Sequence, residues 1–289
     1  MKKILLSIAM IALVGSGIAG LTGAFYGDTE TSTGNTFVAG AVELSIDSVA
    51  HYNGMVCTEN NGWQPSDNPE AFGDPVGYPV AGSDCDGTWT LRDLDGEKFF
   101  NFDDLKPGDY GENTISVHVT SNDAWLAARF VGHENADNGV LDPEFDASPD
   151  EDGLDGTWCG ELAQNITYTA WVDDGAIDGW QCLGDGAECN ADSEEGDNIR
   201  QDGEVVIELD ELVLSENEAA LACANLVDGD TLDTGWILLG QVPGGETHYY
   251  GIAWSLPLAV GNEAQTDSID MDIEFAVEQV RNNPTPFQI

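Results

Sequence analysis

The strongest constraint on the fold is a regular alternation of apolar and acidic residues close to the C-terminus. Between Ser268 and Val280, apolar side chains fall on alternate positions and acids lie between them: Ile269, Met271, Ile273, Phe275 and Val277 against Asp270, Asp272, Glu274 and Glu278. Successive side chains of a β-strand point to opposite faces, so one face of this strand is apolar and the other is acidic. Such a strand needs a second layer that buries its apolar face.

The remaining sequence predicts further short strands separated by turns. Glycine occurs 34 times and proline 11 times, which favours many short elements over long helices. Strands are expected at Thr36–Ile46, Thr88–Leu91, Phe99–Phe102, Ile115–Val119, Trp125–Val131, Ile166–Ala170, Glu204–Leu209, Trp236–Val242 and Thr247–Leu256. Ala50–Asp86 is expected to be a loop region, and the capping box Ser215-x-x-Glu218 opens one helix through about Leu226. The expected fold is all-β, an antiparallel jelly-roll-like β-sandwich with long acidic loops and one short helix.

The charge of the chain excludes several classes of function. Eight Lys+Arg face 54 Asp+Glu, for a net charge of −46. Nucleic-acid binding and docking on anionic lipid both need a basic surface, which so few cations cannot supply. Hydrophobic residues make up 42% of the chain, which is enough apolar material for a packed core and argues against disorder.

The first 24 residues have the features of a secretory signal peptide. Lys2 and Lys3 precede the apolar run Ile4–Val14, and small apolar residues follow up to Ala24. Cleavage is expected between Ala24 and Phe25, which would leave a secreted protein with no membrane segment after processing. A membrane anchor is the alternative, because the uncharged stretch Ile4–Tyr26 could just span a bilayer.

Export makes disulfides the expected state of the six cysteines. We expect Cys57–Cys85, Cys182–Cys189 and Cys159–Cys223, the second of which closes a short loop, although the sequence leaves other connectivities open. A zinc site is the alternative. It lacks support because no C-x-x-C pair occurs and the four histidines are scattered.

Three blocks of the sequence resemble the TasA/camelysin family. The junction Ala24–Ser32, continuing through Asn35-Thr36-Phe37, resembles the region cleaved by a SipW-type signal peptidase. Leu105–Asp109 (LKPGD) precedes a strand, and the C-terminal block from Gln265 to Asn283 is similar to the closing strand of many family members. A family segment of the form WxDDGDN…QDGE is split here into Trp171–Gly175 and Asp197–Glu204, with 176–196 as an inserted loop. That loop contains Cys182 and Cys189, which supports their pairing.

The resemblance implies a jelly-roll subunit of extracellular fibres in a biofilm matrix or on a cell surface. Its partners would be other copies of itself and the signal peptidase. Residues 25–37 would form an N-terminal donor strand, and 38–289 would form a single β-sandwich domain. This chain departs from the family prototype in being more acidic and in carrying more cysteines.

The residues themselves are compatible with strand donation. Phe25–Phe37 is polar, rich in Thr and has no evident hairpin partner. A strand from another chain can satisfy the unpaired backbone groups at a sheet edge. Phe25, Tyr26 and Phe37 would be its apolar anchors. The alternatives are a flexible tail and a first strand that pairs within its own subunit. The high negative charge predicts that assembly needs salt or divalent cations.

Calcium is the one cofactor that the sequence suggests. Asp173, Asp174, Asp197, Asn198 and Glu204 cluster around the split motif, and Ca²⁺ prefers carboxylate and amide oxygens. The alternative is a solvated acidic loop. Catalysis is not expected: His133-Glu134 lacks the second histidine of H-E-x-x-H, and no G-x-S-x-G motif occurs. The competing class of function is a monomeric Ca²⁺-binding surface or matrix protein, with a camelysin-like metallo-endopeptidase as a remote third.

Overall fold

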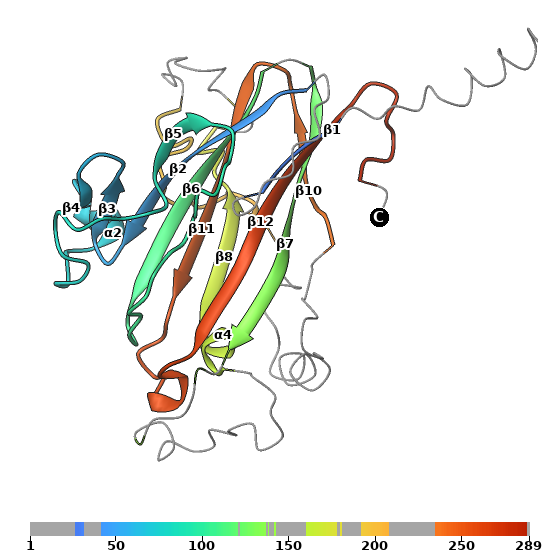
Figure 1. Cartoon of the computed structure of the whole chain (residues 1–289). Coiled ribbons are helices and arrows are strands. Elements are labelled where there is room, and N and C mark those ends of the chain that lie inside the picture. Colours follow the sequence, from blue (N-terminus) through green and yellow to red (C-terminus); the bar gives the residue numbers. More distant parts are fainter. Residues whose placement is uncertain are drawn as a thin grey trace, which may run out of the picture.

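Two antiparallel sheets face one another across a hydrophobic core in the computed structural model (Figure 1). The structure describes residues 27–31, 42–120, 122–136, 138, 142, 160–177, 180, 192–207 and 235–287, with only the backbone of 27–31, 133–135 and 164. The all-β sandwich predicted from the sequence is confirmed.

The smaller sheet, sheet A, is built around the C-terminal strand. Its order is β1 (Gly27–Thr31), β12 (Ser268–Gln279), β7 (Ala124–Ala136) and β10 (Ile237–Val242). The alternation that predicted β12 is confirmed, because Ile273, Phe275 and Val277 are buried in the core. In Figure 1, β1 lies beside β12 at the edge of this sheet.

The larger sheet, sheet B, carries the polar features described below. Its order is β4 (Gly62–Pro65), β3 (Met55–Thr58), β2 (Leu44–Tyr52), β6 (Tyr110–Val119), β11 (Glu246–Ser255), β8 (Thr167–Val172) and β9 (Val206–Ile207), and β5 (Trp89–Arg92) also pairs with β2. Two short helices, α2 (Pro69–Phe72) and α4 (Leu162–Asn165), and the 3-10 turn Asn262–Ala264 complete the described elements.

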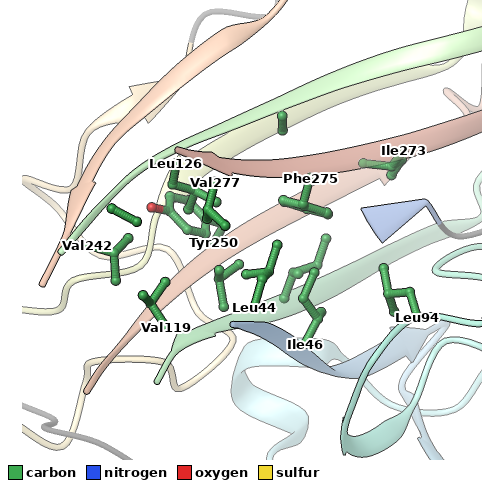
Figure 2. Packing of buried hydrophobic residues seen from close by; sticks show 14 of the residues in the cluster. Leu44, Ile46, Leu94, Val119, Leu126, Val242, Tyr250, Ile273, Phe275 and Val277 are labelled. Atoms are coloured by element: carbon green, nitrogen blue, oxygen red, sulfur yellow. The ribbon is translucent and has the colours of Figure 1, made fainter. Parts of the chain in front are cut away.

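The core lies between the two sheets. Leu44, Ile46 and Val119 of sheet B meet Leu126 and Phe275 of sheet A, and all five are buried (Figure 2). The chain crosses repeatedly between the layers, since β6, β8 and β11 belong to sheet B while β7, β10 and β12 belong to sheet A. Residues far apart in sequence therefore share one core, and burial of their apolar surface is the main stabilising term.

A second buried cluster lies at one end of sheet B, around Tyr52, Trp63 and Trp254. The predicted disulfide Cys57–Cys85 is confirmed beside it, with 5.9 Å between the two Cα atoms. Cys159, Cys182, Cys189 and Cys223 lie outside the described residues, so their pairing stays a prediction.

The LKPGD motif forms the turn before β6. The Asp109 carboxylate accepts hydrogen bonds from the Lys106 backbone N–H (2.7 Å), the Tyr52 hydroxyl (2.8 Å) and the Asn53 amide (2.8 Å). The motif therefore connects the end of β2 to the start of β6 through these hydrogen bonds.

Some predicted elements were wrong or shifted. Ala50–Asp86 was expected to be a loop, yet it contains the end of β2, the β3–β4 hairpin and α2. Phe99–Phe102 is not a strand, although Phe99 is buried against Trp89. The strand expected at Thr36–Ile46 begins only at Leu44 among the described residues. The helix expected at 215–226 lies outside them, while α2 and α4 were not predicted.

No helix within the described residues is long and apolar enough to cross a membrane. The signal-peptide prediction for residues 1–24, with cleavage at Ala24 and Phe25, lies outside the described part, as do Tyr26 and Phe37.

Candidate functional site: a buried carboxyl cluster and an edge strand

The outer face of sheet B is polar but covered. On β6, the side chains of Ile115, Val117 and Val119 enter the core, so Glu112 and Thr114 lie on the opposite face. Both are nevertheless buried. The cover comes partly from the loop 192–205, whose residue Gly196 lies against the ring of Tyr249 on β11.

The acids of the split motif meet beneath this loop. Asp173 follows the end of β8, and its charge interacts with those of Glu204 and Asp197. The charge of Asp174 in turn acts on Glu204, and the backbone N–H of Asn198 hydrogen-bonds Asp173. The structure therefore brings the carboxyl groups of Asp173, Asp197 and Glu204 together, whereas Asp174 acts through its charge and Asn198 through its backbone.

Asp173 is the most buried member of the cluster, with 0% of its surface exposed. Its Oδ1 atom accepts a hydrogen bond from the Gly196 N–H (3.1 Å), and its own N–H donates to the Tyr249 carbonyl (3.0 Å). Its Oδ2 atom is buried without a hydrogen-bond partner. Burial, followed by the charges of Glu204 and Asp197, raises the pKa of Asp173 from 3.8 to about 8.

Glu204 and Asp197 hold the loop through its backbone. Glu204 accepts hydrogen bonds from the N–H groups of Gly175 (3.0 Å) and Gln201 (2.7 Å). Asp197 Oδ1 accepts from the Ile199 N–H and from the Gln201 amide, both at 2.9 Å. Burial nevertheless raises the pKa of both carboxyl groups. The Asp173 and Glu204 carboxyls lie close enough to share a hydrogen bond when one of them is protonated.

The turn at Gly175 requires glycine. Its φ is +73°, and a Cβ there would lie 2.7 Å from Asp192 Oδ2. The absence of a side chain at Gly175 leaves room for the Asp192 carboxylate. This carboxylate accepts hydrogen bonds from the N–H groups of Ile177 (2.7 Å) and Glu194 (3.0 Å), which lower its pKa. The two ends of the inserted loop are thereby joined.

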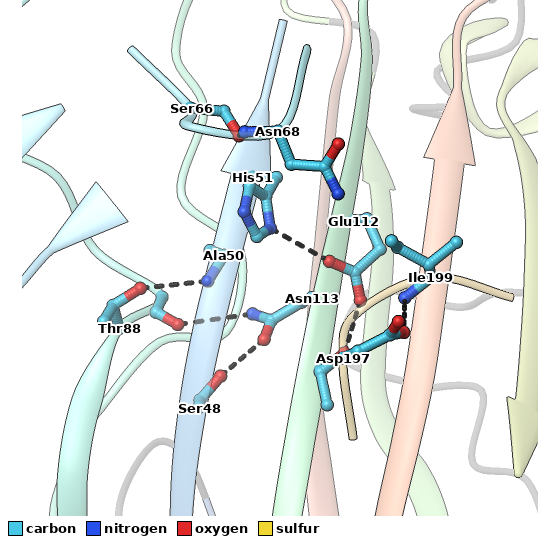
Figure 3. Close-up of polar contacts among 12 residues, drawn as sticks. Ser48, Ala50, His51, Ser66, Asn68, Thr88, Glu112, Asn113, Asp197 and Ile199 are labelled. Carbon is cyan, nitrogen blue, oxygen red and sulfur yellow. Dashed lines mark hydrogen bonds and ion pairs between the residues drawn. The ribbon is translucent and has the colours of Figure 1, made fainter. Parts of the chain in front are cut away.

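Glu112 is the member that sequence reasoning missed. Its carboxyl group accepts a hydrogen bond from the Thr114 hydroxyl (2.7 Å) and lies 3.2 Å from His51 Nδ1, as Figure 3 shows in part. Burial raises the pKa of Glu112 well above its usual value, and the charges of Asp173 and Asp197 add to the rise. Burial lowers the pKa of His51 to about 4. Burial therefore disfavours the charged form of both groups.

This arrangement can hold protons or a cation. The main causes of these pKa shifts include no Lys or Arg. Buried carboxyls without a cationic partner must stay protonated or bind an ion. Among the described residues, however, no three His, Cys, Asp or Glu side chains already converge on one point that could hold a metal. Most of their oxygens face backbone N–H groups, so a cation would have to use remaining lone pairs such as those of Asp173 Oδ2.

The remaining histidines of sheet B occupy structural positions. His118 contacts Asp47 through Nε2 and Thr247 through Nδ1, both at 2.9 Å. His248 stacks on Trp180, and burial lowers its pKa to about 3.

The second candidate site is the edge of sheet A. β1 pairs antiparallel with β12 from Gly27 opposite Glu278 to Thr31 opposite Glu274. The segment proposed as a donor strand therefore pairs with its own chain here, which is one of the alternatives stated from the sequence. β12 extends beyond this ladder to Ser268, and no described strand pairs with that part on the β1 side.

Comparison with known proteins adds no assignment, since no family model and no curated protein matches the chain.

Proposed function

We propose that the mature chain is a non-catalytic, secreted subunit of extracellular fibres of the TasA/camelysin type, which polymerises by exchanging its N-terminal strand. The observation that carries the proposal is the position of β1: a short edge strand at the N-terminal end that pairs with the core strand β12. Opposite β1, β12 contributes Phe275 and Val277 to the core. A strand at this edge therefore protects a buried element.

Exchange is feasible because the contacts are the same in either arrangement. A β1 from another copy can form the same ladder on β12, so the difference in free energy between self-pairing and donation is small. Each net hydrogen bond of such a ladder contributes only about 0.5–1.5 kcal/mol, so a five-residue strand can be displaced. A head-to-tail contact of this kind continues into a filament.

Self-pairing is the state that competes with assembly. The segment 32–41 links β1 to the body of the domain, and such short linkers create effective concentrations of about millimolar. The net charge of −46 further opposes contact between copies. Assembly should therefore need high protein concentration together with salt or divalent cations.

The test is electron microscopy of the purified mature protein. Thr29 lies in the middle of the β1 ladder, and Thr29→Pro removes its N–H and disfavours a paired strand. We expect Thr29→Pro and a deletion of 25–36 to abolish filaments, while Thr29→Val retains them. Circular dichroism should report a folded domain in all variants. Filaments that survive the deletion would refute strand exchange.

The second candidate function is Ca²⁺ binding by the carboxyl cluster. The observation that favours it is the buried, unpartnered Oδ2 atom of Asp173 within a group of acids. Ca²⁺ would neutralise this group and bind carboxylate and amide oxygens. Calorimetry should give Ca²⁺ affinity that Asp173→Asn and Asp197→Asn weaken. Unchanged affinity in both variants would exclude this site.

A further inference from the structure

A cavity of about 310 Å³ lies next to the carboxyl cluster, on the outer face of sheet B. It is formed by the end of β2, the helix α2, the starts of β6 and β8, the end of β11 and the loop residues 198–200. Its volume is at the lower end of the range for small-molecule sites. It takes no part in the strand exchange proposed above.

The walls of the cavity are fixed and partly aromatic. The ring of Phe72 stacks on His51, with centroids 3.7 Å apart and planes 2° from parallel. The Tyr110 hydroxyl donates to the Phe72 carbonyl (2.9 Å), and the Asn68 side chain caps α2. Ala253 of β11 and Thr169 of β8, which lie opposite one another in the sheet, line the cavity on the side of the sheet and form its floor. A flat ligand could rest on this floor beside the aromatic wall.

The charges of the lining favour a neutral ligand. Burial disfavours the charged forms of Glu112 and His51, because it raises the pKa of Glu112 and lowers that of His51. The remaining charge is Arg200, which is exposed and makes no hydrogen bond or ion pair within the described part of the chain. Arg200 disfavours a cationic ligand, and the net charge of −46 repels polyanions.

Several hydrogen-bonding groups of the lining are unoccupied. The Thr169 hydroxyl and the Asn198 side-chain amide, like Arg200, have no partner among the described residues. Together they offer donors and acceptors to a ligand in the cavity. The guanidinium fork and the amide are planar groups that can each contact two neighbouring hydroxyls.

We propose that this cavity binds a neutral saccharide of one or two rings. A pyranose has an apolar face of C–H groups, which suits an aromatic wall, and a rim of hydroxyls that both donate and accept hydrogen bonds. Phe72 would contact the apolar face. Arg200, Asn198 and Thr169 would bind the hydroxyls.

The test is NMR titration of the mature, 15N-labelled protein, in buffer of constant salt. The probes are the methyl glycosides of glucose, galactose, mannose and N-acetylglucosamine, with sodium glucuronate and tetramethylammonium chloride as anionic and cationic probes. Thr169→Trp fills the cavity, and Leu238→Trp places the same side chain on the exposed face of β10 as its control. Arg200→Gln removes the fork, with exposed Arg281→Gln as its control.

At least one neutral glycoside should give saturable shifts at Thr169, Ala253 and Asn198, and the two charged probes should not. Thr169→Trp should abolish these shifts, and Arg200→Gln should weaken binding about tenfold, while both controls bind as the parent protein does. Any of three results would overturn the proposal: no saturable shift with any neutral glycoside, tighter binding of a charged probe, or unchanged binding in both cavity variants. Filament formation is measured separately and does not enter this outcome.

Discussion

Replacing Asp173 by Asn should stabilise the fold when Ca²⁺ is absent, and this advantage over the parent protein should shrink when Ca²⁺ is present. The substitution keeps the shape of the side chain and the oxygen that accepts from the Gly196 N–H. It removes the acid that burial and the charges of Glu204 and Asp197 hold at a pKa of about 8 instead of 3.8. The new amide can also donate to Glu204.

The sign follows from proton linkage. Between pH 4 and pH 8 the unfolded chain loses the Asp173 proton, while the folded chain retains it. The folded state therefore binds more protons, and the free energy of unfolding falls as pH rises through this window. At 1.36 kcal/mol for each unit of pKa, the full difference amounts to at most about 6 kcal/mol. Below pH 4 and above pH 8, Asp173 no longer makes the free energy of unfolding depend on pH.

The assay is urea denaturation at pH 5, 6.5 and 8, in EDTA and in excess Ca²⁺. In EDTA we expect Asp173→Asn to be less pH-dependent than the parent and more stable at pH 8. In Ca²⁺ the parent should gain about 2.7 kcal/mol at a concentration one hundred times its Kd, and the variant should gain much less. Asp202→Asn, at an exposed position of the same loop, is the matched control. Parallel pH profiles for parent and variant in EDTA would refute the raised pKa of Asp173. Equal stabilisation of both proteins by Ca²⁺ would show that Asp173 is not a Ca²⁺ ligand.

The next three predictions concern Glu112, the Cys57–Cys85 disulfide and the net charge of the chain. Glu112→Gln should stabilise the fold at pH 7 in chemical denaturation, because burial raises the pKa of Glu112 and the neutral amide avoids the resulting loss of stability as pH rises; a loss of several kcal/mol would mean that the fold depends on an ionised Glu112. Cys57→Ser together with Cys85→Ser, which opens a loop with a sequence separation of 28, should lower the free energy of unfolding by about 3–4 kcal/mol; no loss would indicate that the reduced chain already holds this loop. Light scattering should show faster assembly as NaCl rises towards about 1 M, where screening lengths fall to about 3 Å; assembly that slows with salt would contradict repulsion between copies.

The sequence predicted the elements whose local pattern and tertiary role agree. β12 and β6 alternate because one face enters the core, so β12 was located to within one residue and β6 in its second half. The β3–β4 hairpin could not be found in this way. Met55–Thr58 and Gly62–Pro65 lie among turn residues, and the Cys57–Cys85 bridge and the packing of Trp63 hold them in place.

The strand predicted at Phe99–Phe102 was wrong for the opposite reason. Its aromatic residues have a high preference for strands, but they serve as side chains that a loop inserts into the core. Phe99 packs against Trp89 and Phe275, with ring centroids 5.0 and 6.0 Å apart. Contacts between distant segments thus override local propensity.

The same difference between local pattern and tertiary contact separates the site residues that the sequence predicted from the one that it missed. The five acids around the split motif were identified because they lie near two short sequence blocks. Glu112 lies on a strand about sixty residues earlier, and only the loop that covers sheet B makes it buried. A polar residue at every second position of a strand marks a face, but the sequence does not show what covers that face.

The central claim, that copies exchange β1, can be tested by disulfide trapping between chains. Thr29 of β1 lies opposite Ala276 of β12, so Thr29→Cys and Ala276→Cys are prepared as separate proteins, mixed and assembled in salt under mild oxidation. Strand exchange predicts that filaments of the mixture contain covalent dimers that join one variant to the other, which mass spectrometry identifies by the linked peptide. Filaments that form without this link, while the double variant closes the same bond within a single chain, would contradict the account.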